Sequence, residues 1–294
     1  MNIILAGGTG LIGTHIVQRL KQGGNTVSIL SRKAGPGLVA WDAVHSGPWE
    51  NSIDGADAVI NLTGESVGAG RWSTRQKERI RNSRIEATQA IVEAIRKSVK
   101  KPRVLVNASA VGYYGHVEDG DVTENAPAGS DFLGQTCALW ESEARKAEQW
   151  GVRVVMMRTG FVIGKDSDAF KRMQLPFKLF AGGPFGSGKQ WFPWIHIDDV
   201  AAGYIFAIEQ SALAGPVNLS APNPVRVREL ATELGHTLHR PSFMPAPAFA
   251  LKIILGEMSD LLLNGQKMIP AKLLQQGFTF RFPVLSAALA NAVG

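Results

Sequence analysis

Short apolar runs and segments with apolar residues at helical spacing alternate along most of this chain. The runs are typical of buried strands and occupy residues 2–6, 26–30, 57–62, 104–109, 152–158 and 216–220. Segments in which apolar residues recur on one helical face lie between them, at 14–24, 73–97, 132–150, 198–209 and 228–238. Strands that alternate with helices in this way predict an α/β fold built on a parallel sheet.

A glycine-dense turn separates the first strand from the first helix. Its glycines are spaced Gly7-x-x-Gly10-x-x-Gly13, with Thr9 among them and Leu11 and Ile12 opening the helix. Unpaired N–H groups at a helix N-terminus, together with glycines that allow close approach, suit a dinucleotide pyrophosphate. We therefore expect Gly7, Thr9, Gly10, Leu11, Ile12 and Gly13 to bind a dinucleotide, the alternative being an ordinary strand-to-helix turn.

The second strand ends in Ser31-Arg32-Lys33. An acidic residue at this point binds the ribose 2′-hydroxyl of NAD, whereas an arginine accommodates the 2′-phosphate of NADP. The acidic residue is absent here, and an arginine can hold a phosphate through paired charge-assisted hydrogen bonds. We predict NADP(H) as the cofactor, with Ser31 and Arg32 on its 2′-phosphate, and keep a basic surface turn as the alternative.

The third strand ends at Asn61, Leu62, Thr63 and Gly64, which we expect to border the cofactor because ligands bind at the carboxyl ends of parallel strands. Many cations follow in residues 75–103, and a solvated helix face is the first explanation for them. A contact of one or two arginines with an anionic ligand is the second. Nucleic-acid binding is the least favoured, although the net charge of +6 is compatible with it.

Composition narrows the class of protein. The 294 residues are 45% hydrophobic and 19% charged, as expected for a soluble globular protein. No apolar run reaches the roughly 18 residues of a membrane span, so we expect no membrane partner. Residues 245–263 carry charges and predict an amphipathic helix. The single cysteine, Cys137, rules out an internal disulfide and favours a reducing compartment such as the cytoplasm.

Several further motifs complete a pattern that resembles the extended short-chain dehydrogenases/reductases of the sugar-nucleotide-epimerase kind. They are the glycine turn, 61–64, Ser109 with Tyr114-Gly115, Glu124-x-x-Pro127, 158–164 and 196–200, which span residues 1 to about 235. A subgroup named epimerase family proteins, with an appended C-terminal domain of unknown function, is similar over nearly the whole chain. Its shared features are Arg71-Trp72, Ser83-Arg84, 182–184, 186–188 and the tail. The resemblance implies a doubly wound Rossmann-type parallel sheet with a smaller C-terminal substrate portion, and places Arg158 near the nicotinamide.

The chain departs from that family at the acid–base pair Tyr-x-x-x-Lys. Alignment of Trp140-Glu141-Ser-Glu143 puts Gln135 and Leu139 where the tyrosine and lysine belong, and neither side chain titrates. Ser109 matches the family's hydroxyl residue, with Ala110 as the rival position. Tyr113, Tyr114 and Cys137 are the remaining candidates for a proton donor, and a protein that binds NADP(H) without catalysis is the alternative.

The distal half contains an aromatic-rich segment and a polar cluster. Phe185, Trp191 and Trp194 lie among glycines in 170–196, which we interpret as a loop-rich wall that either lines a substrate pocket or packs the smaller domain. In the cluster of His196, Asp198 and Asp199, a structural role is favoured over a metal or acid–base site. No metal site is expected elsewhere, and residues 277–283 predict a strand.

These expectations divide the chain and define its function. Residues 1–165 with about 195–222 form an NADP-binding domain, 166–194 and 223–244 form substrate-side insertions, and 245–294 form a small C-terminal domain. The leading hypothesis is an NADP(H)-dependent oxidoreductase or epimerase-like enzyme that acts on a small molecule. The alternative is a catalytically silent NADP(H)-binding regulator or scaffold, and the sequence leaves a homo-oligomer open.

Overall fold

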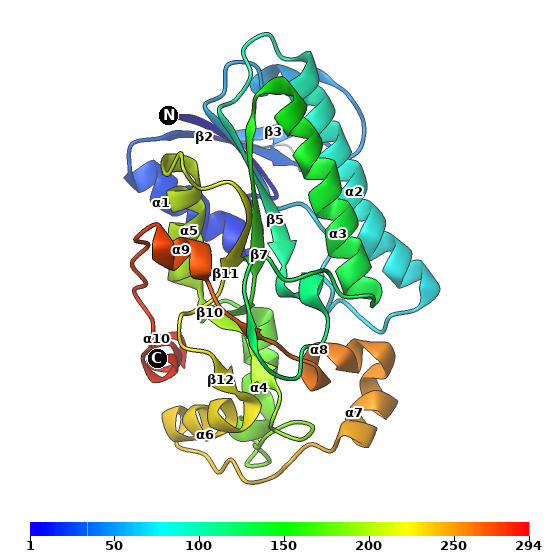
Figure 1. Ribbon diagram of the computed structural model, residues 1–294, viewed down its shortest axis with the longest axis vertical. Helices are drawn as coiled ribbons and strands as arrows, with labels where there is room; N and C mark the ends of the chain where they lie inside the picture. Colours follow the sequence, from blue (N-terminus) through cyan, green and yellow to red (C-terminus); the bar gives the residue numbers. More distant parts are fainter. Residues whose placement is uncertain (34, 294) are drawn as a thin grey trace.

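A seven-stranded parallel sheet forms the centre of the protein in the computed structural model, which describes residues 1–33 and 35–293 (Figure 1). The strands run in the order β11-β7-β5-β4-β1-β2-β3. Their bounds are β1 Asn2–Ala6, β2 Thr26–Ser31, β3 Leu38–Ala40, β4 Ala58–Asn61, β5 Val104–Ala110, β7 Arg153–Thr159 and β11 Gly215–Leu219. The chain starts in the middle of the sheet, moves to one edge and then crosses to the other, so the doubly wound Rossmann-type prediction is confirmed.

Helices cover both faces of the sheet because its strands are apolar on both sides. On one face Ile3, Leu5 and Ile60 pack against α1 (Leu11–Gln22) and α5 (Ile197–Glu209). On the other face Ile4 and Val59 pack against α2 (Thr74–Lys97) and α3 (Phe132–Arg145). The two layers leave the carboxyl ends of β1, β4 and β5 at one common edge.

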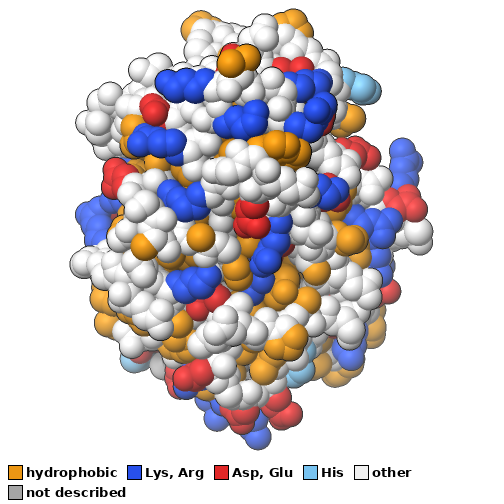
Figure 2. Space-filling model, turned by 45° about the horizontal axis from the view of Figure 1, so that its top comes forward, with side chains coloured by type: hydrophobic (Ala, Val, Ile, Leu, Met, Phe, Trp, Pro, Cys, Tyr) orange, Lys and Arg blue, Asp and Glu red, His pale blue; other side chains and the backbone are white. Residues whose placement is uncertain are grey.

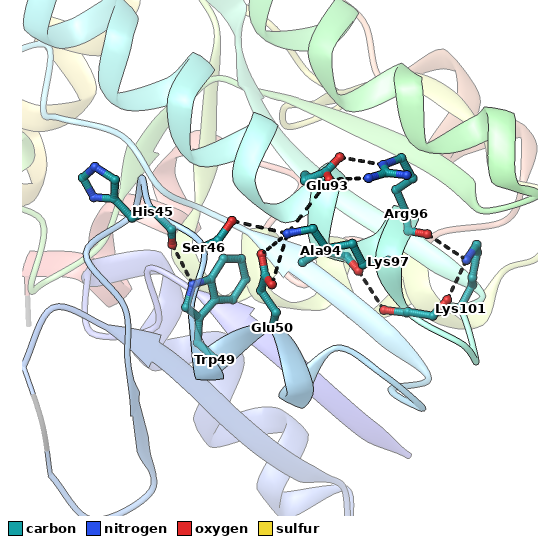
Figure 3. A network of polar contacts seen from close by, with 10 residues as sticks. His45, Ser46, Trp49, Glu50, Glu93, Ala94, Arg96, Lys97 and Lys101 are labelled. Atoms are coloured by element: carbon teal, nitrogen blue, oxygen red, sulfur yellow. Dashed lines mark hydrogen bonds and ion pairs between the residues drawn. The ribbon is translucent and has the colours of Figure 1, made fainter.

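The long helix α2 is fixed at both ends. Ser73 caps its first turn by accepting a hydrogen bond from the N–H of Gln76. At the other end the Lys97 ammonium lies 3.1 Å from Glu50 Oε1 in the 3₁₀ helix η1 (Pro48–Ser52), and Lys101 Nζ donates to the last carbonyls of the helix, those of Arg96 and Ser98 (Figure 3). These contacts hold the basic C-terminal turn of α2 against the segment that follows β3.

Most of the smaller elements lie below the sheet (Figure 1), whereas residues 271–275 pack beside β11 and residues 146–150 pack on α2. The helices are α4 Asp168–Lys178, α6 Val227–Leu238, α7 Ala248–Leu255, α8 Asp260–Leu263, α9 Ala271–Gln275 and α10 Leu285–Val293. The short strands are β6 Asp121–Val122, β8 Phe161–Ile163, β9 Trp191–Phe192, β10 Trp194–His196, β12 Val225–Arg226 and β13 Lys267–Met268. Further 3₁₀ helices are η2 Val111–Tyr114, η3 Lys146–Trp150 and η4 Gly256–Ser259.

Three expectations about these distal segments are wrong. The aromatic-rich region is not all loop, because α4 begins with a Ser167 cap and buries Phe170 and Phe177 on one face. Residues 277–283 form no strand; Phe278 and Phe282 instead pack as single anchors. The predicted helix over 245–263 is broken at Gly256, whose φ of 60° is incompatible with a continuous α-helix.

The cluster of His196, Asp198 and Asp199 attaches the C-terminal tail to α5. The two carboxylate oxygens of Asp199 accept the backbone N–H groups of Arg281 (2.7 Å) and Phe282 (2.9 Å). Asp198 pairs with the Arg281 guanidinium at 2.8 Å, and the His196 ring stacks on Phe282 with ring centres 3.9 Å apart. This geometry agrees with the structural role favoured for the cluster.

Candidate functional site

The glycine turn after β1 is shaped by two close approaches. A Cβ on Gly13 would lie 2.6 Å from the carbonyl oxygen of Gly7, so only glycine lets the helix pack onto the turn. Gly7 itself has φ of 79° and lies against the backbone of Leu62. A Cβ on Gly10 would meet only the Gly7 carbonyl oxygen, at 3.6 Å, and otherwise open space. That open space borders the helix start, where a phosphate is expected.

The first turn of α1 presents free donors to that space. Gly10 occupies the cap position and offers no side chain, and the first helical bond runs from Thr14 N–H to the Gly10 carbonyl at 2.9 Å. The N–H groups of Leu11, Ile12 and Gly13 therefore lack intrahelical partners. The buried hydroxyl of Thr63, beyond the end of β4, also has no hydrogen-bond partner within the described residues. Unpaired donors at a helix N-terminus fit an anionic dinucleotide.

Ser31 and Arg32 lie one strand over from the turn. Ala6 pairs with Leu30 in the sheet, so Gly7 lies beside Ser31, the last residue of β2. Arg32 is exposed and forms no ion pair with any described residue, while Ser31 Oγ accepts a hydrogen bond from Lys33 N–H at 3.1 Å. An unpaired guanidinium at this place is free to bind a phosphate.

The end of β4 rests on a buried network of side-chain hydrogen bonds. Asn61 Nδ2 donates to Asn107 Oδ1 at 2.7 Å and to Thr88 Oγ1 at 2.9 Å, and Trp140 Nε1 donates to the same Thr88 oxygen. Asn61 is completely buried and also accepts from the N–H of Thr63. Asn61 therefore supports the backbone of residues 62–64 from the core side, and a direct contact between Asn61 and a cofactor is not favoured.

Among the cations of α2, Arg84 is the one whose side chain is half-buried beside the residues that follow β4. Its Nη1 donates to the carbonyl of Glu65 at 3.0 Å, and its guanidinium lies 5.1 Å from the Trp140 ring centre. A Cβ added to Gly64 would stand 3.1 Å from Arg84 Cζ. Burial lowers the pKa of this arginine, and nearby Glu65 partly opposes the change. Sequence reasoning grouped Arg84 with a solvated helix face, and only the Ser83-Arg84 resemblance singled it out.

A buried ion pair joins α3 to β7 beneath the site. Arg158 donates through Nε and Nη2 to the two oxygens of Glu141, each at 2.8 Å, and through Nη1 to Tyr114 Oη at 2.9 Å. Ser109 Oγ donates to Glu141 Oε1 at 2.7 Å. Burial alone would lower the pKa of Arg158, but its bonds to Glu141 raise that pKa above its ordinary value. All four side chains are buried, so direct contact between Arg158 and a cofactor is not favoured.

The two adjacent tyrosines have different environments. Tyr114 is buried, donates its hydroxyl to Asn218 Oδ1 and has a pKa raised by burial to about 12, which argues against proton transfer to a substrate. Tyr113 is only half-buried, and its hydroxyl forms no hydrogen bond within the described residues. The Arg158 guanidinium carbon lies 3.4 Å from the Tyr113 ring centre. This stacking fixes the ring at the carboxyl edge of the sheet while its hydroxyl stays free.

The helix face that meets this edge differs from the one expected. Gln135 and Leu139 point to solvent, and Gln135 Nε2 donates to the carbonyl of Ser130. On the inner face, Leu133 and Cys137 have the same four-residue spacing. A Cβ added to Gly112 would lie 3.0 Å from the Leu133 side chain, and the Cys137 thiol accepts a hydrogen bond from the Ala110 N–H. Burial raises the pKa of Cys137 to about 12. The alignment is therefore shifted by two residues, yet the inner face also lacks a tyrosine and a lysine.

Of the aromatic residues expected on the substrate side, some pack in the core and others are partly exposed at the surface. Trp194 is fully buried in the core formed by α4 and α6, and Phe185 packs against the same core. Trp191 is half-buried and lies 3.9 Å below the guanidinium of Arg226. Packing is thus the better explanation for Trp194 and Phe185, although Phe185, like Trp191, is only partly buried.

Half of the ten Lys and Arg side chains in 75–103 form ion pairs within the described part of the molecule. These ion pairs are Lys77–Glu257, Arg79–Glu65, Arg96–Glu93, Lys97–Glu50 and Arg103–Asp57. Figure 2 shows Lys and Arg side chains mixed with acidic and hydrophobic ones over one face of the molecule. This arrangement does not favour a nucleic-acid surface. Residues 1–33 and 35–293 contain no group of His, Cys, Asp and Glu suited to a metal ion.

Comparison with known proteins agrees with this architecture. Residues 3–219 match the model of the NAD dependent epimerase/dehydratase family, and residues 246–292 match a domain of unknown function, DUF1731. The chain is 41% identical to the chloroplastic Epimerase family protein SDR39U1 homolog of Arabidopsis thaliana, covering 98% of this chain and 86% of the relative. It is 39% identical to Epimerase family protein YfhF of Bacillus subtilis, covering 100% and 98%.

Solved structures give the same result. The crystal structure of human epimerase family protein SDR39U1 (isoform 2) with NADPH superposes with a TM-score of 0.91 at 36% identity, covering 99% of both chains. A nucleoside-diphosphate sugar epimerase from Corynebacterium glutamicum has a TM-score of 0.82 at 33% identity, covering all of this chain and 58% of that one. The resemblance seen in the sequence is therefore confirmed, and this chain belongs to the NAD dependent epimerase/dehydratase family.

Proposed function

We propose that this protein is an NADP(H)-dependent oxidoreductase or epimerase-like enzyme that reduces or oxidises a small carbonyl or alcohol substrate. The division into an NADP-binding part (1–165 with about 195–222), substrate-side insertions (166–194 and 223–244) and a C-terminal domain (245–294) is part of the proposal. The cytoplasm remains the proposed compartment on the basis of the lone Cys137, although one relative is named as chloroplastic.

Binding of NADP(H) is supported by the unpaired donors at the start of α1 and by the free Arg32 guanidinium. The pyrophosphate is expected on the N–H groups of 11–13, beside the space in front of Gly10. The 2′-phosphate is expected on Ser31 and Arg32, and the ribose next to residues 62–64. The human relative, which was crystallised with NADPH, supports the same choice. When bound, the dinucleotide supplies or accepts a hydride.

The observation that carries the catalytic part of the proposal is the free hydroxyl of Tyr113 above Arg158. In the reductive direction Tyr113 gives its proton to the carbonyl oxygen as the hydride arrives at the carbonyl carbon. The tyrosinate then regains a proton from water. Arg158 lies under the ring and stabilises the negative charge of the tyrosinate. It thereby supplies part of the electrostatic stabilisation that the lysine of the family's Tyr-x-x-x-Lys pair gives. The buried Ser109 hydroxyl donates its hydrogen bond to Glu141, which favours Tyr113 over Ser109 as the proton donor.

The test compares Tyr113→Phe with Tyr114→Phe in NADPH consumption over a panel of carbonyl compounds and nucleotide sugars. We expect Tyr113→Phe to lower kcat by about 100-fold or more, the usual contribution of a general acid, with NADPH affinity unchanged. Tyr114→Phe should act mainly on stability. Equal activity of Tyr113→Phe and wild type would exclude Tyr113 as the proton donor.

A catalytically silent NADP(H)-binding regulator is the second candidate, and the inner face of α3 favours it. Leu133 occupies the position that requires the acid, and Cys137 is a buried thiol with a raised pKa. On this hypothesis wild-type protein binds NADPH tightly, but no member of the panel is reduced or oxidised. Turnover that depends on Tyr113 would contradict it.

A further inference from the structure

Exposed apolar side chains are concentrated in two segments of the distal layer, 171–182 and 239–256, which together form what we call the distal surface. Of the fifteen large hydrophobic side chains that are strongly exposed in the described residues, eight lie in these two segments, which make up about a tenth of the chain. They are Leu175, Leu179, Phe180, Phe243, Met244, Phe249, Ile253 and Ile254. Scattered apolar residues need no explanation, but such a concentration indicates a contact surface.

Contacts within the molecule make the two segments one surface. The N–H of Met244 donates to the carbonyl of Gly182 at 2.9 Å, and Arg240 stacks on the Phe180 ring, 4.6 Å from its centre. Both α4 and α7 also reach the loop between β4 and α2, where Arg172 donates to the carbonyl of Gly68 and Ile253 accepts from Arg71. In Figure 1 these helices lie at the end of the molecule opposite the N-terminus.

The helix α7 is the most unusual part of this surface. It is strongly apolar over Ala248–Leu255, yet none of its residues is buried. Phe249 and Ile253, four residues apart, are neighbours on one helical face, and Ile253 is 70% exposed. A helix whose apolar face has no partner within its own chain gains stability only by covering that face from outside.

The charges within the two segments are all positive, and the adjoining Glu257 is paired with Lys77. The cations are Lys171, Arg172, Lys178, Arg240 and Lys252, and neither segment contains an aspartate or a glutamate. A second copy of this chain, seated symmetrically on the same face, would place these cations opposite one another and be repelled. The surface therefore requires an anionic partner that also accepts protruding phenylalanine, isoleucine and leucine side chains.

We propose that the distal surface docks on an anionic lipid bilayer, with α7 lying in the plane of the membrane interface. Exposed aromatic and aliphatic side chains flanked by Lys and Arg are the composition that interfacial helices use, the apolar groups entering the acyl boundary and the cations meeting lipid phosphates. No helix in residues 1–33 and 35–293 is long and apolar enough to cross a membrane. The contact is therefore peripheral, and a search for spanning segments does not reveal it. The proposal does not depend on the catalytic function.

The experiment is co-sedimentation of the full chain with vesicles of neutral lipid and with vesicles that contain about one third anionic lipid. The wild type should sediment with the anionic vesicles and be released by high salt. Ile253→Glu should reduce the bound fraction about tenfold. Lys252→Ala should reduce binding about fivefold, as expected for the loss of one interfacial cation. Val99→Glu is the matched control, because Val99 is 93% exposed but lies outside the distal surface.

Three outcomes would overturn the proposal. The first is that the wild type sediments with neither kind of vesicle. The second is that Ile253→Glu and Val99→Glu bind vesicles equally well. The third is a stable dimer that Ile253→Glu converts to a monomer, which would show that a second copy covers the face. NADPH affinity is measured for every variant, so that loss of vesicle binding with unchanged NADPH affinity separates the membrane contact from the proposed function.

Discussion

Of two alanine substitutions in the glycine turn, one should lower stability and the other should weaken NADPH binding, and the structure gives the reason for each. A Cβ on Gly13 would lie 2.6 Å from both the Gly7 carbonyl oxygen and the Gly8 Cα, distances that real Cβ atoms do not show. Because both contacts are with backbone, the turn or the helix must move. Overpacking of this kind costs about 1–3 kcal/mol.

Gly10→Ala introduces the same methyl group without that clash. Gly10 has φ of −83° and ψ of 174°, which alanine adopts freely, and the added Cβ would meet one atom, the Gly7 carbonyl oxygen, at an ordinary 3.6 Å. The loss of a favourable cap residue and the lower entropy of the unfolded chain nearly cancel, so stability should change by less than about 0.5 kcal/mol. The methyl group would, however, occupy the space in front of the free N–H groups of α1.

Thermal unfolding and NADPH titration together distinguish the two variants. Without cofactor, Gly13→Ala should lower Tm by about 2–12 °C, at about 2–4 °C per kcal/mol for a chain of roughly this size. Gly10→Ala should leave Tm near that of wild type. Gly10→Ala should weaken NADPH binding at least about tenfold, or about 1.4 kcal/mol. Wild-type affinity in Gly10→Ala would show that no phosphate lies against this turn, and an unchanged Tm in Gly13→Ala would show that the packing argument is wrong.

The other predictions concern cofactor choice, tail docking and pH. Arg32→Ala should weaken NADPH binding by about 1.5–3 kcal/mol, the value of a hydrogen-bonded charge, and NADH binding far less; an equal loss for both would refute the choice of NADP(H). Asp199→Asn should cost about 1–3 kcal/mol, because one of the N–H groups of Arg281 and Phe282 loses its acceptor. It should speed hydrogen exchange in 278–293, whereas Asp198→Asn, which breaks a partly exposed ion pair, should cost less than about 1 kcal/mol. Burial lowers the pKa of His196 to about 4, below an unfolded value of about 6.5; its contribution to stability is therefore complete above pH 6.5 and is lost as the pH falls toward 4. Between pH 7 and 5 the loss should be about 2 kcal/mol, and urea titrations of His196→Gln should show a smaller dependence on pH.

The central sheet was largely predictable because its signals are local. Strands buried on both faces appear as continuous apolar runs, and the spacing of Gly7, Gly10 and Gly13 reports a backbone approach that other residues cannot make. The family resemblance rests on the same local motifs. The distal helix α4 was missed because Pro176 and the surrounding glycines disguise its period. In 277–283 the alternating phenylalanines imitate a strand, although no strand partner exists for them in the described structure.

The candidate site was less predictable because its members meet only through the fold. The sequence does not show that Arg158 bonds Glu141 or that Tyr114 is buried while Tyr113 is not, since adjacent residues share one sequence context. The placement of Gln135 and Leu139 was wrong by two residues for a related reason. Helix α3 contains two glutamates, and only the packing reveals that Glu141 faces the sheet while Glu143 pairs with Lys146 at the surface.

The buried pair of Arg158 and Glu141 is difficult to explain by stability alone. Removal of two charges from water is expensive, and apolar residues of similar volume often replace such a pair without loss of stability. In this protein the pair has further contacts that an apolar substitute could not make. Arg158 stacks on Tyr113 and bonds Tyr114, while Glu141 accepts from Ser109, so that β5, η2, α3 and β7 are fixed to one another at the carboxyl edge. We infer that the pair serves to hold the Tyr113 ring in place, which an enzyme requires and which a protein that only binds dinucleotide does not.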